Sequence, residues 1–263
     1  MQHTAESLVK IDLVLPTEPP KGGVEFEVAV VFRIEPKWHI YWANPGDSGV
    51  ATRVDSDLPD GWKVGALRFP RPQTFVTPYE TTFGYEEAVA LFLPLTAPPG
   101  GLGDMNQLEL GIRWMVCKEL CFAGAVTRTA AIPGSAPDAD VAAIIDRSRR
   151  RLPKPLAASK ATASLARSGT TTSLRIEGPL PPDRGAAVGF VPLETPGVEY
   201  GERAVERSAD RFVLTIPLEI NPGNALGAPL RAAGLLTFGD AEGPSFDVDL
   251  PLAASGSNPA PAS

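Results

Sequence analysis

The sequence predicts an all-β protein with two β-sandwich domains, joined by a short helical and proline-rich connector. Two observations support this fold class. Apolar residues recur at every second position in several segments, and 28 prolines and 25 glycines divide the 263 residues into short stretches. Because proline and glycine interrupt helices and favour turns, this composition argues against a helical bundle. Short alternating strands separated by turns are typical of β-sandwiches.

Four segments alternate between apolar and polar residues, which is the period of a half-buried strand. We expect each segment to turn one face towards a core and the other towards water. Hydrophobic residues make up 43% of the chain, which is ample material for two cores. In chain order, the apolar positions are Val24, Phe26, Val28, Val30 and Phe32, then Leu108, Leu110, Ile112, Trp114 and Val116, then Phe212, Leu214, Ile216 and Leu218, and finally Phe246, Val248 and Leu250.

One segment, residues 138–151, has helical spacing instead. It places Val141, Ile144 and Ile145 on one face, begins with acidic residues and ends with arginines. This order of charges matches the dipole of a helix. Pro153 follows shortly afterwards, so we expect the helix to end before it.

The helix suggests how the domains are organised. We expect a first domain at residues 1–135, a helical connector and linker at 136–167, and a second β-sandwich at 168–252. Residues 253–263 have the alanine, serine and proline content of a flexible C-terminal tail.

Composition also narrows the function. The formal net charge is −7 and no long basic run is present, which argues against nucleic acid or an anionic membrane as the main partner. The longest apolar run, residues 88–93, is too short to span a bilayer, so we expect no direct membrane insertion. No signal segment opens the chain. Two histidines and two cysteines leave little material for a four-ligand zinc site, so we expect neither a metal nor a small-molecule cofactor.

The two cysteines, Cys117 and Cys121, are the evident reactive groups. If the strand through Val116 turns back at residues 118–120, Val116 lies opposite Phe122 on the core face, and the two cysteines lie opposite each other on the solvent face. Directly opposed strand residues are close enough for a disulfide. The sequence therefore predicts an outward-facing disulfide at the tip of a β-hairpin.

The cysteine spacing alone fits a redox-active disulfide and a structural one equally well. Closing a five-residue loop stabilises a fold by only about 2 kcal/mol, and exposed disulfides exchange readily with thiols. Arg113 and Lys118 would favour a thiolate, whereas Glu119 would oppose it. Copper binding is a further alternative, in which two thiolates and His39 would hold a soft ion such as Cu(I).

Three motifs resemble the signature of one family. They are residues 38–49 (WHIYWANPGDSG), 83–86 (FGYE) and 114–121 (WMVCKELC). Together they resemble the N-terminal periplasmic region of DsbD-type transmembrane thiol:disulfide reductases, and in particular the ScsB-like branch. The motifs all lie in the first domain. The second domain carries no matching motif, although ScsB-like proteins have a longer N-terminal region than DsbD.

The resemblance implies immunoglobulin-like domains and a redox site. Cys117 and Cys121 would be catalytic, with Cys121 attacking a partner disulfide and Cys117 resolving the mixed disulfide. In this family an aromatic cap loop shields the pair, and the matching stretch here supplies Tyr79, Phe83 and Tyr85. Candidates for tuning the thiols are Arg113, Lys118, Glu80, Glu86 and Glu87.

The resemblance also implies a function in the periplasm. The chain would be a protein-disulfide reductase module that works without a cofactor. It would take electrons from a transmembrane reductase domain of the same longer chain, tethered to the inner membrane, and reduce disulfides of periplasmic thioredoxin-fold partners. The alternative is a non-catalytic extracellular binding or adhesion module with a structural disulfide.

Overall fold

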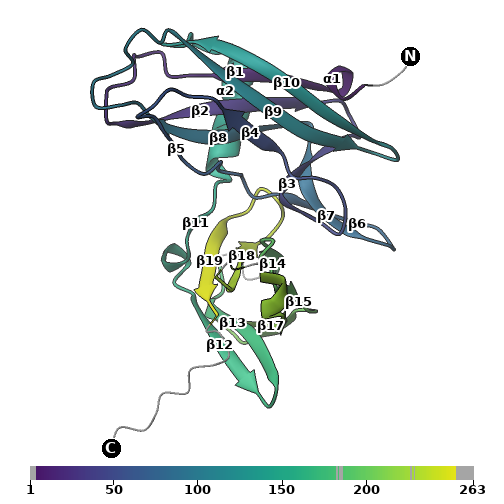
Figure 1. The fold of residues 1–263 in the computed structure, drawn as a ribbon. Coiled ribbons are helices and arrows are strands. Elements are labelled where there is room, and N and C mark those ends of the chain that lie inside the picture. The colour runs from purple at the N-terminus through teal and green to yellow at the C-terminus, as the bar shows by residue number, and fades with distance from the viewer. Residues whose placement is uncertain (1–3, 182, 184–185, 226, 228, 253–263) are drawn as a thin grey trace, which may run out of the picture. The chain divides into compact units, whose positions relative to one another are not determined.

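The computed structural model describes residues 4–181, 183, 186–225, 227 and 229–252, so the expected tail lies outside the described residues. The chain divides into two compact units, Met1–Leu152 and Pro153–Ser263 (Figure 1). Within the described residues, each unit consists mainly of antiparallel strands arranged in two sheets. The predicted all-β fold class is therefore confirmed.

The first unit forms two sheets. One sheet has the order β1 (Val9–Val14), β2 (Glu25–Ile34), β8 (Ala88–Thr96) and β5 (Lys63–Val64). The other has the order β10 (Cys121–Ala131), β9 (Gln107–Cys117), β3 (His39–Gly46), β7 (Thr81–Glu86) and β6 (Gln73–Val76), and β4 (Arg53–Ser56) also pairs with β9. Two helices accompany the sheets, α1 (Ala5–Leu8) and α2 (Ala139–Arg150).

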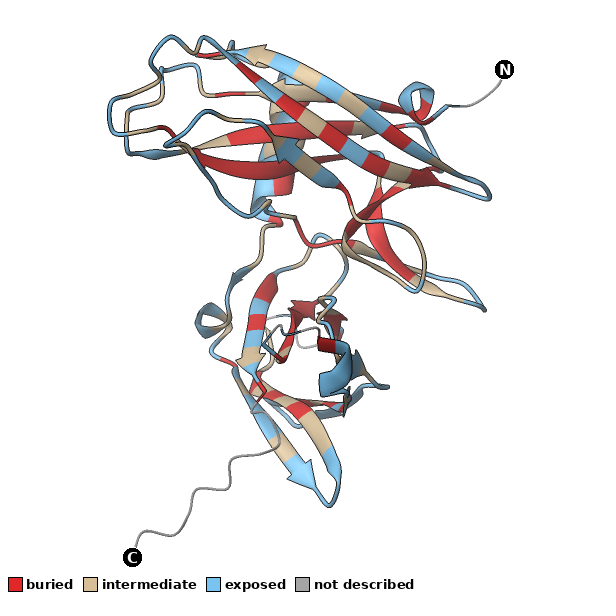
Figure 2. Ribbon diagram, in the orientation of Figure 1, coloured by how far each residue is buried: buried red, intermediate tan, exposed pale blue. Residues whose placement is uncertain are grey.

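The alternating apolar positions of the sequence face the core of this unit. On β9, every predicted core residue from Leu108 to Val116 is buried, and Figure 2 shows the alternation along this strand. On β2, Val28 and Phe32 are fully buried, but Val24 lies before the strand begins and is exposed. Val31, on the opposite face of β2, is also fully buried, which a half-buried strand would not show.

Helix α2 explains why β2 is buried on both faces. Val141 is buried in a cluster with Phe92 of β8, and Ile144 and Ile145 pack against the same cluster. The guanidinium of Arg149 lies 4.5 Å from the centroid of the Phe92 ring. Burying these side chains removes apolar surface from water on both the helix and the sheet, which stabilises their contact.

The observed division of the chain differs from the expected one. Residues 136–167 do not form a separate connector, because α2 packs on the first unit and the residues after Leu152 join the second. In the second unit, β11 (Lys154–Pro155) and β12 (Thr162–Ser168) extend its two sheets. The second sandwich therefore begins earlier than residue 168.

The second unit also contains two sheets. One has the order β11, β19 (Ser245–Pro251), β18 (Arg231–Phe238) and β14 (Val188–Pro192). The other has the order β12, β13 (Thr171–Pro179), β17 (Arg211–Ile220) and β15 (Val198–Tyr200), and β16 (Ala204–Arg207) pairs with β17. Short 3-10 helices lie at Leu156–Ser159 and Pro222–Ala225. The predicted core positions of β17, from Phe212 to Leu218, are all buried.

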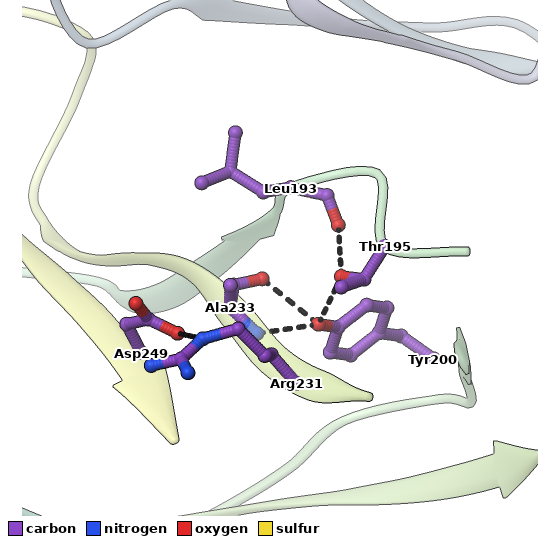
Figure 3. A network of polar contacts seen from close by, with 6 residues as sticks. All are labelled: Leu193, Thr195, Tyr200, Arg231, Ala233 and Asp249. Carbon is purple, nitrogen blue, oxygen red and sulfur yellow. Dashed lines mark hydrogen bonds and ion pairs between the residues drawn. The ribbon is translucent and has the colours of Figure 1, made fainter. Parts of the chain in front are cut away.

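A polar contact joins these two sheets (Figure 3). The hydroxyl of Tyr200 on β15 donates to the carbonyl oxygen of Ala233 on β18 at 2.9 Å, and accepts the amide of Ala233 at 2.7 Å. Oγ1 of Thr195 lies 3.3 Å from the same hydroxyl. Arg231 and Asp249 form an ion pair between β18 and β19. The Tyr200 hydroxyl thus provides hydrogen-bond partners for the backbone of the buried Ala233 on the facing sheet. Buried polar groups are normally hydrogen-bonded in this way.

Candidate functional site

The predicted hairpin and its disulfide are present. In the register of β9 and β10, Cys117 is paired with Cys121 and Val116 with Phe122, as the sequence predicts. The two sulfurs are bonded at 2.03 Å and the two Cα atoms lie 4.2 Å apart. The amide of Lys118 donates to the carbonyl oxygen of Leu120 at 3.1 Å, which closes the turn.

The two cysteines differ in exposure. Cys121 is exposed, whereas only 2% of the Cys117 surface is accessible. Both cysteines lie on the outer face of the sheet, as predicted, but only Cys121 is exposed to solvent there and Cys117 is buried. The physical reason is the sheet order, because β9 lies between β10 and β3 while β10 lies at the edge of the described sheet.

A histidine and two aromatic rings lie on the outer face of the sheet beside Cys117. His39 of β3 lies directly opposite Cys117 in the register of β3 and β9. Its ring stacks on Phe75 of β6 at 4.9 Å between centroids, and lies edge-on to Tyr41 at 5.1 Å. The loop after β3 packs on this group, since a Cβ added to Gly49 would lie 2.3 Å from the Tyr41 ring.

Burial and one carboxylate set the charge of this group. Burial lowers the pKa of His39 below its ordinary value of 6.5, and the charge of Glu80 partly opposes that shift. Burial raises the pKa of Tyr41, a hydrogen bond with Ser48 lowers it, and Glu80 raises it. Glu80 is positioned by its turn, where its amide donates to Oγ1 of Thr77 at 3.1 Å. Neutral imidazole is therefore the favoured form of His39 in the folded protein.

The three expected cap residues do not lie together over the cysteines. Tyr79 is 95% exposed in the turn between β6 and β7. Phe83 is buried and lies edge-on to Trp42, with 6.3 Å between ring centroids. Tyr85 is fully buried, and its hydroxyl donates to the carbonyl oxygen of Pro70 at 2.6 Å. Phe83 and Tyr85 thus point into the core rather than towards the disulfide.

The expected thiol-tuning residues are placed as follows. Arg113 shares the outer face of β9 with Cys117, but it is exposed and paired with Asp55 at 2.6 Å. Lys118 is exposed in the hairpin turn and Glu87 is exposed after β7. Glu86 lies directly opposite His39 on β7. Of these residues, Glu80 and Glu86 therefore accompany His39, a residue that the sequence suggested as a copper ligand.

A shallow hollow of about 460 Å³ lies on the outer face of β9 and β10. Ala123 and Ala125 line it and share a face of β10 with Cys121, because side chains two apart on a strand point the same way. Leu120, in the turn between the cysteines, is 69% exposed. The whole lining consists of Val50, Ala51, Arg53, Arg113, Trp114, Met115, Ala123, Gly124 and Ala125.

Two further findings concern metal binding and membrane-spanning helices. Among the described residues, the side chains of His, Cys, Asp and Glu form no group of three or more arranged to hold a metal ion. Within the same ranges, every helix is too short or too polar to cross a membrane.

Comparison with known families bears on the cysteine hairpin directly. Residues 13–132 match the family model described as thiol:disulfide interchange protein DsbD, N-terminal. This part of the chain matches the DsbD N-terminal family. The resemblance predicted from the three motifs is therefore confirmed, and the DsbD N-terminal match includes β3, β7 and both cysteines. Together the match and the cysteine pair suggest a thiol:disulfide interchange module.

Comparison with solved structures extends the likeness in fold to both units. The N-terminal periplasmic domain of ScsB from Proteus mirabilis is 17% identical, with a TM-score of 0.64, and the alignment covers 96% of each chain. At this identity the likeness establishes the fold alone, which is of the immunoglobulin-like sandwich type. A protein of unknown function from Porphyromonas gingivalis W83 aligns over 93% of this chain and 99% of its own, at 14% identity and a TM-score of 0.24. Comparison with curated proteins found no match.

Proposed function

We propose that this chain is the electron-relay module of a periplasmic protein-disulfide reductase. It receives electrons from a transmembrane reductase domain of a longer chain and passes them to disulfides of thioredoxin-fold partners. The observation that carries the proposal is an exposed Cys121 bonded to a buried Cys117, at a hairpin tip within a DsbD N-terminal match. The ScsB domain of similar fold is described as periplasmic, which supports the location.

Thiol–disulfide exchange needs no group beyond the two cysteines. In the reduced module, the Cys121 thiolate attacks one sulfur of the partner disulfide, and the partner's other sulfur leaves as a thiolate. Cys117 then attacks the Cys121 sulfur, which re-forms the Cys117–Cys121 bond and releases the second partner thiolate. Two electrons pass to the partner. The exposure of Cys121 supports its role as the attacking thiol, and the burial of Cys117 suits the resolving thiol.

The surface around Cys121 supports a protein as the partner. On β10 the hollow is lined from Ala123, two residues beyond Cys121, and small residues contribute to its lining beside Arg113 and Trp114. Leu120, between the two cysteines, and Tyr79, in the β6–β7 turn of the same sheet, are large and exposed. Exposed apolar groups around a reactive atom are typical of a protein-binding surface. We infer that the partner's disulfide approaches Cys121 over this surface.

The roles of the two cysteines can be separated with single substitutions. The reduced protein is mixed with dithiobis(nitrobenzoate), a small aromatic disulfide that releases a coloured thiolate. The unsubstituted protein should release two equivalents and return to its disulfide form. Cys117→Ala should release one equivalent at the same rate and retain a mixed disulfide on Cys121. Cys121→Ala should react at least about tenfold more slowly, because a buried thiol is poorly accessible and ionises reluctantly.

Two outcomes would contradict the proposal. If the disulfide of the unsubstituted protein cannot be reduced by dithiothreitol without unfolding, the bond is structural and the binding or adhesion alternative is favoured. If Cys121→Ala forms the adduct faster than Cys117→Ala, the order of attack is reversed.

A further inference from the structure

We propose that His39 is the proton acceptor for Cys117 during resolution of the mixed disulfide. This inference rests on the proposed function and adds a third residue to the exchange site. The need for such a residue follows from the burial of Cys117. A thiol must lose its proton before it attacks, and burial disfavours the charged thiolate.

The position of His39 meets this need. It is the direct cross-strand neighbour of Cys117, and the adjacent pair in the same register is Ile40 and Val116. Directly opposed residues of antiparallel strands have Cβ atoms about 4.5–5.5 Å apart and project on the same face. The imidazole and the Cys117 sulfur therefore occupy neighbouring places on the outer face of the sheet.

The imidazole also has a nitrogen available for a new hydrogen bond. Nε2 of His39 is buried, and among the described residues it has no hydrogen-bond partner. A buried polar atom without a partner is costly, so it is uncommon unless it has a function. In the disulfide form, Cys117 has no proton to share. Reduction supplies a thiol at the directly opposed strand position, and the thiol and the imidazole can then share a proton.

The surroundings hold the ring in place and keep it neutral. Phe75 stacks on one face of the imidazole and Tyr41 lies at its edge, so the ring has little freedom to turn. The ionisable groups that face it are Glu80 from the β6–β7 turn, Glu86 of β7, Tyr41 and Cys117. Burial lowers the pKa of His39 despite the charge of Glu80, and a neutral imidazole can accept a proton at neutral pH.

The proposed step conserves atoms and charge. After Cys121 has formed a mixed disulfide with the partner, His39 accepts the proton of the Cys117 thiol. The Cys117 thiolate attacks the Cys121 sulfur, the bond between Cys121 and the partner breaks, and the partner sulfur leaves with that electron pair. The proton on His39 then passes to the departing thiolate or to water. The cysteine pair is oxidised by two electrons and the partner disulfide is reduced by two.

Two variants and one control test the role of His39. His39→Gln removes the titrating group and retains hydrogen-bonding ability, whereas His39→Phe retains an aromatic ring for the stack on Phe75. His3→Gln alters the other histidine of the chain and serves as the control. Each reduced protein is mixed with excess dithiobis(nitrobenzoate), and the release of the first and second thiolate is followed over time. Far-ultraviolet circular dichroism checks that each variant is folded.

We expect both His39 variants to release the first thiolate at the unsubstituted rate and the second about 100-fold more slowly at pH 7. In the unsubstituted protein and in His3→Gln, the second step should slow as the pH falls through the pKa of His39, which burial holds below its ordinary value of 6.5. This inflection should be missing in both His39 variants. A structural role alone would not move a pH profile in this way.

The outcomes separate this inference from the function on which it rests. If the unsubstituted protein fails to release two thiolates, the proposed exchange function itself fails. If it releases both, and either His39 variant keeps the unsubstituted second rate and pH inflection, the role of His39 is overturned. The role is also overturned if a variant slows both steps equally, because this would indicate a general disturbance of the hairpin.

Discussion

Single residues on β3 and β7 show how strand alternation divides the aromatic residues of the first unit between two faces. His39 and Tyr41 lie on the outer face beside Cys117, whereas Phe83 and Tyr85 lie in the core. Tyr85 has a polar contact there, because its hydroxyl donates to Pro70. Burial raises the pKa of Tyr85 well above its ordinary value, so this hydroxyl stays protonated as a donor.

The placement of Tyr85 predicts an effect on stability without an effect on exchange. Tyr85→Phe removes the donor to Pro70 and leaves a buried carbonyl without this hydrogen bond, which should lower the free energy of unfolding by about 1–3 kcal/mol. Urea unfolding followed by tryptophan fluorescence measures this for the first unit, because all four tryptophans precede residue 153.

The same variant should react with dithiobis(nitrobenzoate) at the unsubstituted rate. A variant with unchanged stability and altered exchange would instead favour the cap role that the sequence resemblance implied for Tyr85. Phe83→Leu is a suitable companion, since it also changes the core face of β7.

The sequence predicted the cysteine site more accurately than its surroundings, for a physical reason. A tight turn sets the register of its own hairpin, so the opposition of Cys117 and Cys121 follows from local sequence. The neighbours of His39 depend on the pairing of β3 with β7 and β9, which are distant in the chain. The pairing of β3 with β7 is also irregular between Tyr41 and Gly46, so alternation alone could not show which aromatic residues would reach Cys117.

At the scale of whole elements, the β9–β10 turn and the β6–β7 turn of the same sheet each expose one large side chain. The β9–β10 turn exposes Leu120 and the β6–β7 turn exposes Tyr79. The first turn is closed by a backbone hydrogen bond from Lys118, and the second by Thr77, whose amide donates to the carbonyl oxygen of Glu80 at 2.9 Å. These local bonds make the turns suitable for presenting side chains to a partner.

Substitutions in these turns should therefore affect protein partners selectively. Leu120→Ser and Tyr79→Ser should each slow the reduction of oxidised thioredoxin, used as a thioredoxin-fold probe, by about 5-fold to 30-fold, the range for losing 1 to 2 kcal/mol of contact. Reaction with dithiobis(nitrobenzoate) should not change, because this probe is too small to touch both turns. Val205→Ser alters an exposed apolar residue of the second unit and serves as the control. Equal slowing with both probes would show that the turns act on the cysteines rather than on the partner.

Helix α2 shows a second limit of sequence patterns. Its apolar face and the charges at its two ends were predicted from the sequence, and in the structure Asp138 accepts the amide of Val141 at 2.8 Å as an N-cap. The sequence pattern could not predict which surface this face covers. The helix packs on β2 and β8, which lie much earlier in the chain. In β2, the run from Val28 to Phe32 is apolar on both faces of the strand. A continuous apolar run of this kind indicates that a second layer covers the outer face of the sheet.

For the whole molecule, composition and periodicity were sufficient to predict two β-sandwiches, whereas function depended on motifs. The first unit carries all three motifs and the DsbD N-terminal match, and the second unit carries none of them. A relay module must accept electrons from one partner and pass them to another. Its disulfide must therefore be reducible in the folded protein at a potential between those of its two partners.

The midpoint potential of the Cys117–Cys121 bond tests this claim most directly. The protein is equilibrated in a series of redox buffers, the free thiols are trapped with an alkylating agent, and the reduced fraction is measured. Because Cys121 is exposed and the bond closes only a short turn, we expect a midpoint potential of about −200 mV. A midpoint below about −300 mV would mark a structural bond and contradict the relay function.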